Sequence, residues 1–211
     1  MTDSPNARRP SLAERRRVQA MHEIQDVALE LFERDGYRSV PIERIAAAVG
    51  TSASTVYRYF GTKEMLVVWD DYDPQILDLL ATADPEPVAP EELIEQVRAA
   101  ALPLAGAFLT TDEAKIRSRM RLVAAEPDVR AGQLRLAEQL TGAVRVALAA
   151  RLHRDENDLT LRLAAAQAVW GFLAVIDHWV ASGFEPSLRE VFETGTETIA
   201  RSLRAVLVAT D

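Results

Sequence analysis

The chain has 211 residues, of which 48% are hydrophobic, and it carries a net charge of −8. This length can form one sizeable core, or a small domain joined to a larger one, and this composition excludes an intrinsically disordered chain. The absence of cysteine excludes a disulfide framework, a thiolate metal site and a cysteine nucleophile. No uncharged apolar run approaches the ~20 residues of a membrane-spanning helix, and the N-terminus lacks the apolar core of a signal peptide, so we expect a cytoplasmic protein without membrane contact.

Apolar residues recur at helical spacing along almost the whole chain, and no stretch shows the sustained alternation of a strand. Ser11 and Glu14 form the signature of a capping box, which opens a first helix that ends at Gly36. A second helix begins at Pro41 and a third is capped by Ser52. These short helices, separated by glycine and by capping hydroxyl residues, predict a helix-turn-helix.

A fourth helix is expected to be capped by Thr62 and to run through Trp69 and Tyr72 to a kink at Pro74. The proline-rich residues 82–90 have no periodicity and are expected to be a linker. Five further helices are expected near residues 90–109, 112–126, 128–152, 158–182 and 187–208.

The predicted fold is therefore all-α, with about nine helices in two domains. Residues 11–63 would form the three-helix helix-turn-helix head, and residues 64–211 a larger helical domain. Residues 1–63 carry ten Lys or Arg and eight Asp or Glu, a net charge of +2, whereas the rest of the chain carries −10. Only the N-terminal part could thus approach a polyanion without long-range repulsion.

Residues 44–63 read RIAAAVGTSASTVYRYFGTK and contain Arg44, Arg58 and Lys63 but no acid. In a helix-turn-helix the second helix of the motif lies in the major groove, where its N-terminal amides favour phosphate. Hydroxyl groups can bond phosphate oxygens or base edges, and arginine can form two hydrogen bonds with guanine. The segment therefore predicts an element that recognises double-stranded DNA.

Three patterns in the right order and spacing make this prediction specific. They are AxxLFxxxGY from Ala28, IAxxVGxS from Ile45 and TVYxYFxxKExL from Thr55. The run from Ile24 to Leu66 resembles the DNA-binding domain of the tetracycline-repressor family of bacterial transcriptional regulators. The resemblance implies an all-helical protein with three N-terminal helices for DNA and about six further helices for ligand binding and dimerisation.

The resemblance also implies which residues contact DNA. Base-edge or phosphate contacts would come from Thr51, Ser52, Ser54, Thr55 and Arg58. Tyr57 and Tyr59 would lie against the DNA backbone, and Lys63 would bind phosphate. Some members of the family place a basic arm along the groove, and a set of N-terminal arginines resembles such an arm. These arginines could equally form a solvated basic tail: Arg8, Arg9, Arg15, Arg16 and Arg17.

The expected helix at 158–182 is apolar nearly all round after Arg162, so its few polar residues need partners. Gln167, Asp177 and His178 could point into a ligand pocket, or they could be satisfied pairs in a core or an interface. Further candidates for such a pocket are Trp69, Tyr72, Phe108, Met120 and Trp170, although most residues of this kind are simply part of the core.

In the resembled family the last two helices pair with their copies in a four-helix bundle, which implies a homodimer. We therefore predict a ligand-responsive regulator, a repressor released from a palindromic operator by a small apolar effector. The alternative is a transcription factor of the same fold that acts without an inducer, as an activator or a protein-interaction module. An all-helical enzyme is disfavoured because the chain shows no recognisable nucleophile or phosphate loop, and three scattered histidines predict neither a metal site nor a cofactor.

Overall fold

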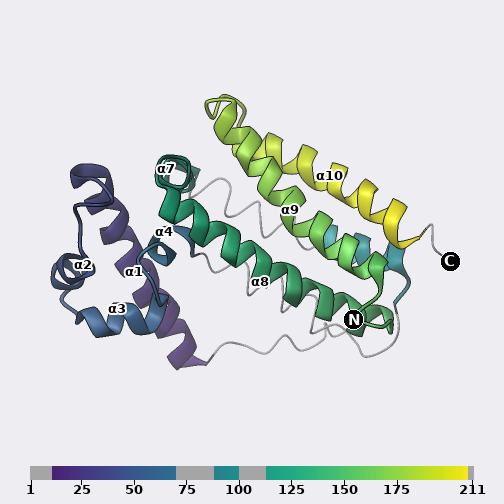
Figure 1. The fold of residues 1–211 in the computed structure, drawn as a ribbon, viewed down its shortest axis with the longest axis horizontal. Helices are drawn as coiled ribbons and strands as arrows, with labels where there is room; N and C mark the ends of the chain where they lie inside the picture. Colours follow the sequence, from purple (N-terminus) through teal and green to yellow (C-terminus); the bar gives the residue numbers. More distant parts are fainter. Residues whose placement is uncertain (1–10, 70–87, 100–112, 209–211) are drawn as a thin grey trace, which may run out of the picture. The chain divides into compact units, whose positions relative to one another are not determined.

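The computed structural model describes residues 11–69, 88–99 and 113–208 (Figure 1). These residues form helices joined by short turns, and none of them lies in a strand, which confirms the all-α prediction. The predicted capping boxes at Ser11 and Ser187 are both present, each with its glutamate three residues later.

The chain divides into two compact units by the packing of its residues. The first unit comprises Met1–Asp71 and Ala114–Leu134, and the second comprises Tyr72–Glu113 and Arg135–Asp211. The first unit therefore contains a segment that follows the predicted head by some 50 residues in the sequence. The functional boundary at residue 63 stays a prediction, because packing alone does not test it.

The first unit is built from α1 (Leu12–Asp35), α2 (Ile42–Val49), α3 (Ala53–Phe60), α4 (Met65–Val68) and most of α7 (Glu113–Ala125). Each helix turns an apolar face inward, as expected for amphipathic helices around one core. The side chains buried in this unit include Ile24, Ala28, Phe32, Val40, Ile45, Val56, Phe60, Leu66 and Val67.

The fourth helix is shorter than its sequence predicted. It begins after Glu64 without a side-chain cap and ends at Val68, because Trp69 takes an extended ψ of 136°. The expected cap by Thr62 and the continuation through Trp69 are therefore wrong, and Tyr72 and Pro74 lie outside the described residues. Three carbonyl groups at this end accept hydrogen bonds from side chains of other helices.

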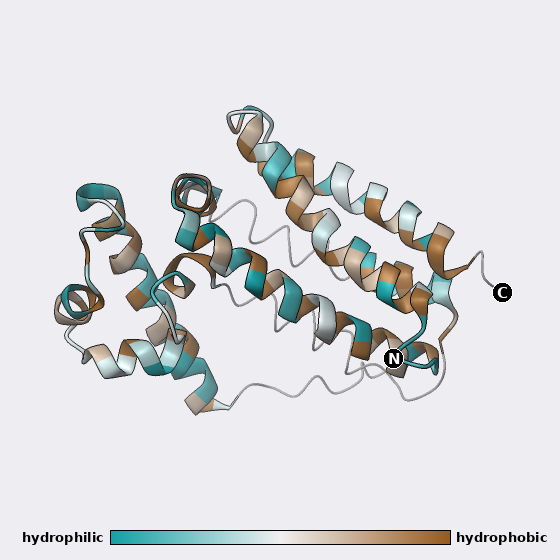
Figure 2. Cartoon of the chain, in the orientation of Figure 1, coloured by the Kyte–Doolittle hydropathy of each residue, from teal (hydrophilic) through white to brown (hydrophobic). Residues whose placement is uncertain are grey.

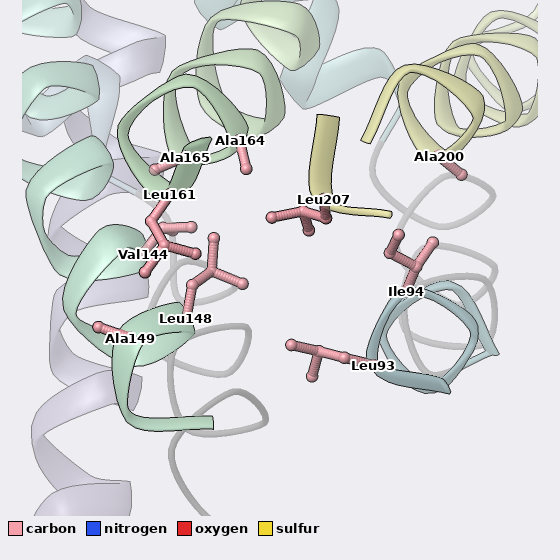
Figure 3. Packing of buried hydrophobic residues seen from close by; sticks show 10 residues of the cluster. All are labelled: Leu93, Ile94, Val144, Leu148, Ala149, Leu161, Ala164, Ala165, Ala200 and Leu207. Carbon is pink, nitrogen blue, oxygen red and sulfur yellow. The ribbon is translucent and has the colours of Figure 1, made fainter. Parts of the chain in front are cut away.

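The second unit contains helical residues 90–99, most of α8 (Pro127–Leu152), α9 (Leu159–Ala181) and α10 (Leu188–Leu207). Pro127 begins α8, a position where its missing N–H costs nothing. Figure 3 shows side chains from these helices converging on one core, namely Leu93, Ile94, Val144, Leu148, Ala149, Leu161, Ala164, Ala165, Ala200 and Leu207.

Helices α9 and α10 form a close antiparallel pair (Figure 1). A Cβ at Gly195 would lie 2.4 Å from Val175 Cγ2, and a Cβ at Gly171 would lie 3.1 Å from Ile199 Cγ1. The buried Trp179 donates its Nε1–H to the Pro186 carbonyl at 2.9 Å and so holds the turn between the two helices. Glycine at 171 and 195 thus permits this close approach within one chain.

Helix α9 is apolar over more of its surface than α8 or α10 (Figure 2). Among the described helices it alone is long and apolar enough to cross a membrane by length and composition. This helix is not an uncharged run, because Arg162 and Asp177 interrupt it, so the expectation from the sequence stands. One such helix is weak evidence for a membrane span, since core helices of soluble proteins pass the same test.

Candidate DNA-binding surface

A tight turn joins α2 to α3. Gly50 ends α2 in the left-handed conformation, at φ 79° and ψ 30°, which glycine adopts without steric cost. The N–H of Gly50 bonds the Ala47 carbonyl at 3.2 Å and the N–H of Thr51 bonds the Ala46 carbonyl at 2.9 Å, the two bonds of a Schellman motif. Ser52 then begins the next helix, so the predicted helix-turn-helix is confirmed.

Helix α3 has one buried face and one exposed face. Val56 and Phe60 are buried, as predicted, and they fix the rotation of the helix about its axis. Ser54, Tyr57 and Arg58 are exposed, and Tyr57 leaves 48% of its surface in water. A large exposed aromatic side chain beside an exposed arginine is available for contact with another molecule.

Hydroxyl groups gather at the N-terminal end of α3. The Ser52 hydroxyl accepts the Thr55 backbone N–H at 3.1 Å, and its oxygen also lies 2.9 Å from Ser54 Oγ and 2.8 Å from Thr55 Oγ1. Ser52 therefore has a structural role as the N-cap of α3. Its predicted contact with DNA stays a prediction.

Tyr59 of α3 contacts two arginines, one from α3 and one from α1. The guanidinium carbon of Arg58 lies 5.2 Å from the centre of the Tyr59 ring, and that of Arg17 lies 5.7 Å from it. Both distances fit a cation–π contact, so two cations contact the same ring. Arg17, which the sequence placed only in an N-terminal arginine arm, is thus part of the surface around α3.

Other cations of residues 38–63 are already engaged. Arg44 Nη2 lies 2.6 Å from an Asp35 carboxylate oxygen, and Arg38 Nε lies 2.9 Å from Glu126 Oε2. Neither Arg17 nor Arg58 forms an ion pair with any described residue. Arg17 and Arg58 therefore keep positive charge beside α3 that no carboxylate among the described residues neutralises.

Lys63 lies against the core of the first unit. Its ammonium donates to the Tyr37 carbonyl at 2.5 Å and lies 4.3 Å from the centre of the Tyr37 ring. Burial lowers the pKa of Lys63, and burial also raises the pKa of Tyr37 to about 12. One of the three N–H donors of Lys63 is thus used inside the protein, a contact that sequence reasoning missed. The predicted contact of Lys63 with phosphate stays a prediction.

The predicted ligand-binding residues are dispersed over the chain. Trp69 and Met120 lie in the first unit, where Trp69 packs its ring against His22 and Phe60. The second unit holds Gln167, half-buried Asp177, exposed Trp170 and exposed His178, whereas Tyr72 and Phe108 lie outside the described residues. Gln167 accepts a hydrogen bond from Ser202 at 3.0 Å, which favours the satisfied pair for that residue. The ligand roles of all these residues stay predictions.

Substitution of Ser52 separates its capping role from contact with DNA. Ser52→Ala removes the cap and is expected to lower the free energy of unfolding by about 0.5–2 kcal/mol. Ser52→Asp keeps a good cap and should hold that free energy near its original value, yet it adds negative charge beside α3 and should weaken DNA binding. Urea unfolding and fluorescence anisotropy with labelled DNA measure the two effects. Unchanged DNA binding by Ser52→Asp would show that this end of α3 does not face DNA.

Two family models together match most of the chain. The model described as bacterial regulatory proteins, tetR family, matches residues 24–68, and the model of the MftR C-terminal domain matches residues 91–204. The first match covers α2, the turn and α3, and the second covers more than half of the chain.

Two curated relatives carry regulatory names. The chain is 28% identical over 169 residues to MftR of Mycobacterium tuberculosis, named for transcriptional regulation of mycofactocin biosynthesis, across 79% of this chain and 82% of that protein. It is 29% identical over 167 residues to the HTH-type transcriptional regulator TcmR of Streptomyces glaucescens, across 74% and 73% of the two chains.

Solved structures share the fold. The fatty acid degradation regulator FadR from Bacillus halodurans matches with a TM-score of 0.52 at 18% identity, over 88% of this chain and 96% of that one. A tetR-family transcriptional regulator from Mesorhizobium loti matches with a TM-score of 0.51 at 21% identity, over 90% and 98%. The chain therefore belongs to the tetR family of bacterial regulatory proteins, and it is a DNA-binding transcriptional regulator.

Proposed function

We propose that this regulator is a homodimeric, cytoplasmic repressor, without enzymatic activity, that an apolar small molecule releases from a palindromic operator. Each protomer would place α3 in the major groove of one half-site. Tyr57 and Arg58 support this docking because both side chains are exposed, and Arg58 lies on the face of α3 opposite to Val56 and Phe60. Arg17 would extend the contact along the phosphate backbone from the start of α1.

The homodimer rests on one observation, the exposed apolar face of α9. Leu159, Leu163 and Trp170 are 69%, 46% and 42% exposed in the single chain. At about 100° per residue, Leu163 and Trp170 lie about 40° and 20° from Leu159, so the three side chains form one stripe along the helix. A contiguous apolar stripe of this kind marks an interaction surface. In a family of two-fold dimers, a second copy of α9 is the partner that we propose for it.

Helix α10 packs against α9 on a face other than the exposed stripe. Phe172 of α9 lies away from the stripe and packs against Phe192 of α10, with ring centres 5.7 Å apart. The predicted dimer through the last two helices would therefore use the exposed stripe of α9 and the edge of α10 beside it.

Selection of DNA from a random library by the purified protein tests the DNA-binding part of the proposal. A two-fold dimer should enrich a palindrome whose half-sites are separated by about one DNA turn, ~34–36 Å, or a multiple of it. Enrichment of a single unpaired half-site would contradict the dimer, and the absence of any enriched sequence would contradict sequence-specific binding.

Arg58 is expected to read a base, unlike arginines that are remote from α3. Arg58→Ala should weaken binding to the selected operator by about 1–3 kcal/mol and relax the preference at one position of each half-site. Arg34→Ala removes an exposed arginine that pairs with Asp35 and serves as the matched control. Anisotropy titrations with single-base variants of the operator measure the preference. An equal loss on every DNA sequence would instead assign Arg58 to phosphate.

Release by an effector is tested by linkage. A panel of apolar compounds is screened by tryptophan fluorescence, and each compound that binds is titrated with and without operator. A releasing compound must bind more weakly in the presence of operator, by the same factor by which it weakens operator binding. Equal affinity in both titrations for every compound that binds would favour the alternative, a transcription factor that acts without an inducer.

A further inference from the structure

The C-terminal end of α4 is held by two buried polar side chains. Arg119 of α7 donates from Nε to the Val67 carbonyl at 2.6 Å and from Nη2 to the Val68 carbonyl at 2.7 Å. Gln25 of α1 donates from Nε2 to the Trp69 carbonyl at 2.8 Å. Arg119 and Gln25 are only 5% and 1% exposed. Three consecutive carbonyl groups are thus bonded by side chains that come from elsewhere in the sequence.

These bonds explain why α4 ends where it does. A helix leaves its last carbonyl groups without backbone donors, and a helix of one turn is not stable by itself. The planar fork of a guanidinium presents two N–H groups in a fixed geometry, which suits two neighbouring carbonyl oxygens. The partial negative charge at the C-terminal end of a helix also favours a cation there. Arg119 therefore stabilises the end of α4 at Val68.

The end of α4 is in contact with the DNA-recognition helix. The ring of Trp69, the residue that follows α4, packs edge-on against Phe60, with ring centres 5.8 Å apart. Phe60 is the last residue of α3 and is buried. Trp69 also packs against His22 of α1, with ring centres 5.1 Å apart. A change in the direction of the backbone at Trp69 would therefore move a side chain on which α3 rests.

Helix α7 is attached to the same unit along its length. Lys115 Nζ lies 2.5 Å from Asp26 Oδ1 of α1, and the Ser118 hydroxyl donates to the Glu33 carboxylate. Arg119 lies between these contacts and the C-terminal part of α7, and it meets a residue 52 positions earlier in the chain. A displacement of α7 would therefore also move the end of α4, because the buried hydrogen bonds of Arg119 join the two helices.

We propose that Arg119 is a positioning residue for DNA recognition, which sets the orientation of α3 through the carbonyl groups of α4 and the ring of Trp69. This inference rests on DNA binding by α3, and it is independent of the dimer and of any effector. It assigns a role in sequence reading to a helix that lies some 50 residues beyond the helix-turn-helix. A purely structural role would instead make Arg119 a contributor to stability, without influence on which DNA sequence is preferred.

The ratio of operator binding to non-specific binding separates these two roles. Arg119→Met keeps the length of the side chain and removes all its donors, whereas Arg119→Lys retains a cation without the fork. Arg121→Met, at an exposed position two residues later on α7, is the matched control. Each variant is titrated with the selected operator and with a scrambled duplex by anisotropy, at a temperature where circular dichroism shows it fully folded.

Arg119→Met is expected to lose roughly tenfold in operator affinity, a change of about 1.4 kcal/mol, while its affinity for scrambled DNA stays within about twofold. Arg119→Lys should lie between Arg119→Met and the original protein, and Arg121→Met should leave the ratio unchanged. A folded Arg119→Met with the original ratio, or with an equal loss on both duplexes, would overturn the proposal.

A second variant keeps the test decisive if Arg119→Met does not fold. Gln25→Met removes the neighbouring donor to the Trp69 carbonyl and is expected to lower the ratio in the same direction. If neither Gln25→Met nor Arg119→Lys lowers the ratio, the proposal is wrong. Failure of the original protein to select any sequence would instead contradict the proposed function, so the two failures are distinguishable.

Discussion

Trp170→Glu is expected to convert the protein from a dimer to a monomer and to lower its operator affinity by roughly 10²–10⁴-fold. The substitution would place a carboxylate at the C-terminal end of the proposed α9 stripe, where burial against a second copy leaves the charge without a partner. A monomer would bind each half-site independently and lose the effective concentration that linkage of two binding sites provides. Light scattering coupled to gel filtration gives the mass, and anisotropy gives the affinity.

The matched control for this substitution is Val146→Glu on α8. Val146 is also an exposed apolar residue of the second unit, at 50% exposure, but it lies on a different helix. Val146→Glu should leave the mass and the operator affinity of the protein unchanged. Ile199 is unsuitable for this test because its side chain packs against Gly171 within the same chain, so its substitution would disturb the fold. A dimeric Trp170→Glu, or a monomeric original protein at micromolar concentration, would contradict the interface.

Gly195→Ala is expected to lower the free energy of unfolding by about 1–3 kcal/mol. The added methyl group would lie 2.4 and 2.8 Å from the two Cγ atoms of Val175, distances that real Cβ atoms do not reach. Valine in a helix has one strongly preferred rotamer, so Val175 cannot turn aside, and α9 and α10 must move apart. Urea unfolding followed by circular dichroism measures the change.

Gly142→Ala on α8 makes the same chemical change without the collision. Nothing lies within 4 Å of a Cβ at Gly142, so alanine should stabilise the helix by about 0.5–1 kcal/mol. The double variant Gly195→Ala/Val175→Ala should recover part of the loss, which a double-mutant cycle quantifies. If Gly195→Ala were as stable as Gly142→Ala, close packing of α9 on α10 at this point would be wrong.

Local sequence was sufficient to predict the ends of several helices. Ser11 and Ser187 open helices through bonds to glutamates three residues away, and Gly50 and Ser52 form a turn within a few residues. The partners of such caps lie in the same short segment, so their spacing is visible in the sequence. The apolar period also identified Val56 as a core residue and left Arg58 on the outer face of α3.

The candidate surface was predicted less completely than the fold. The sequence indicated α3 and its hydroxyl residues, because an acid-free helix after a glycine turn is a local pattern. It did not indicate that Arg17 would lie over Tyr59, or that Lys63 would donate to the Tyr37 carbonyl 26 residues away. Such contacts depend on how separate helices pack, and no spacing along the chain encodes them.

The sequence by itself determined the all-helical class, the positions of most helices and the family, because each depends on periodicity, caps and motifs within short segments. Tertiary structure alone decided that α4 ends at Val68 and that α7 packs with the DNA-binding helices. Trp69 continues an apolar run and would favour a longer helix locally, yet Arg119 reaches the carbonyl groups of α4 from 52 residues away. A buried guanidinium that satisfies two carbonyl groups at once outweighs the small propensity of a few residues to extend a helix.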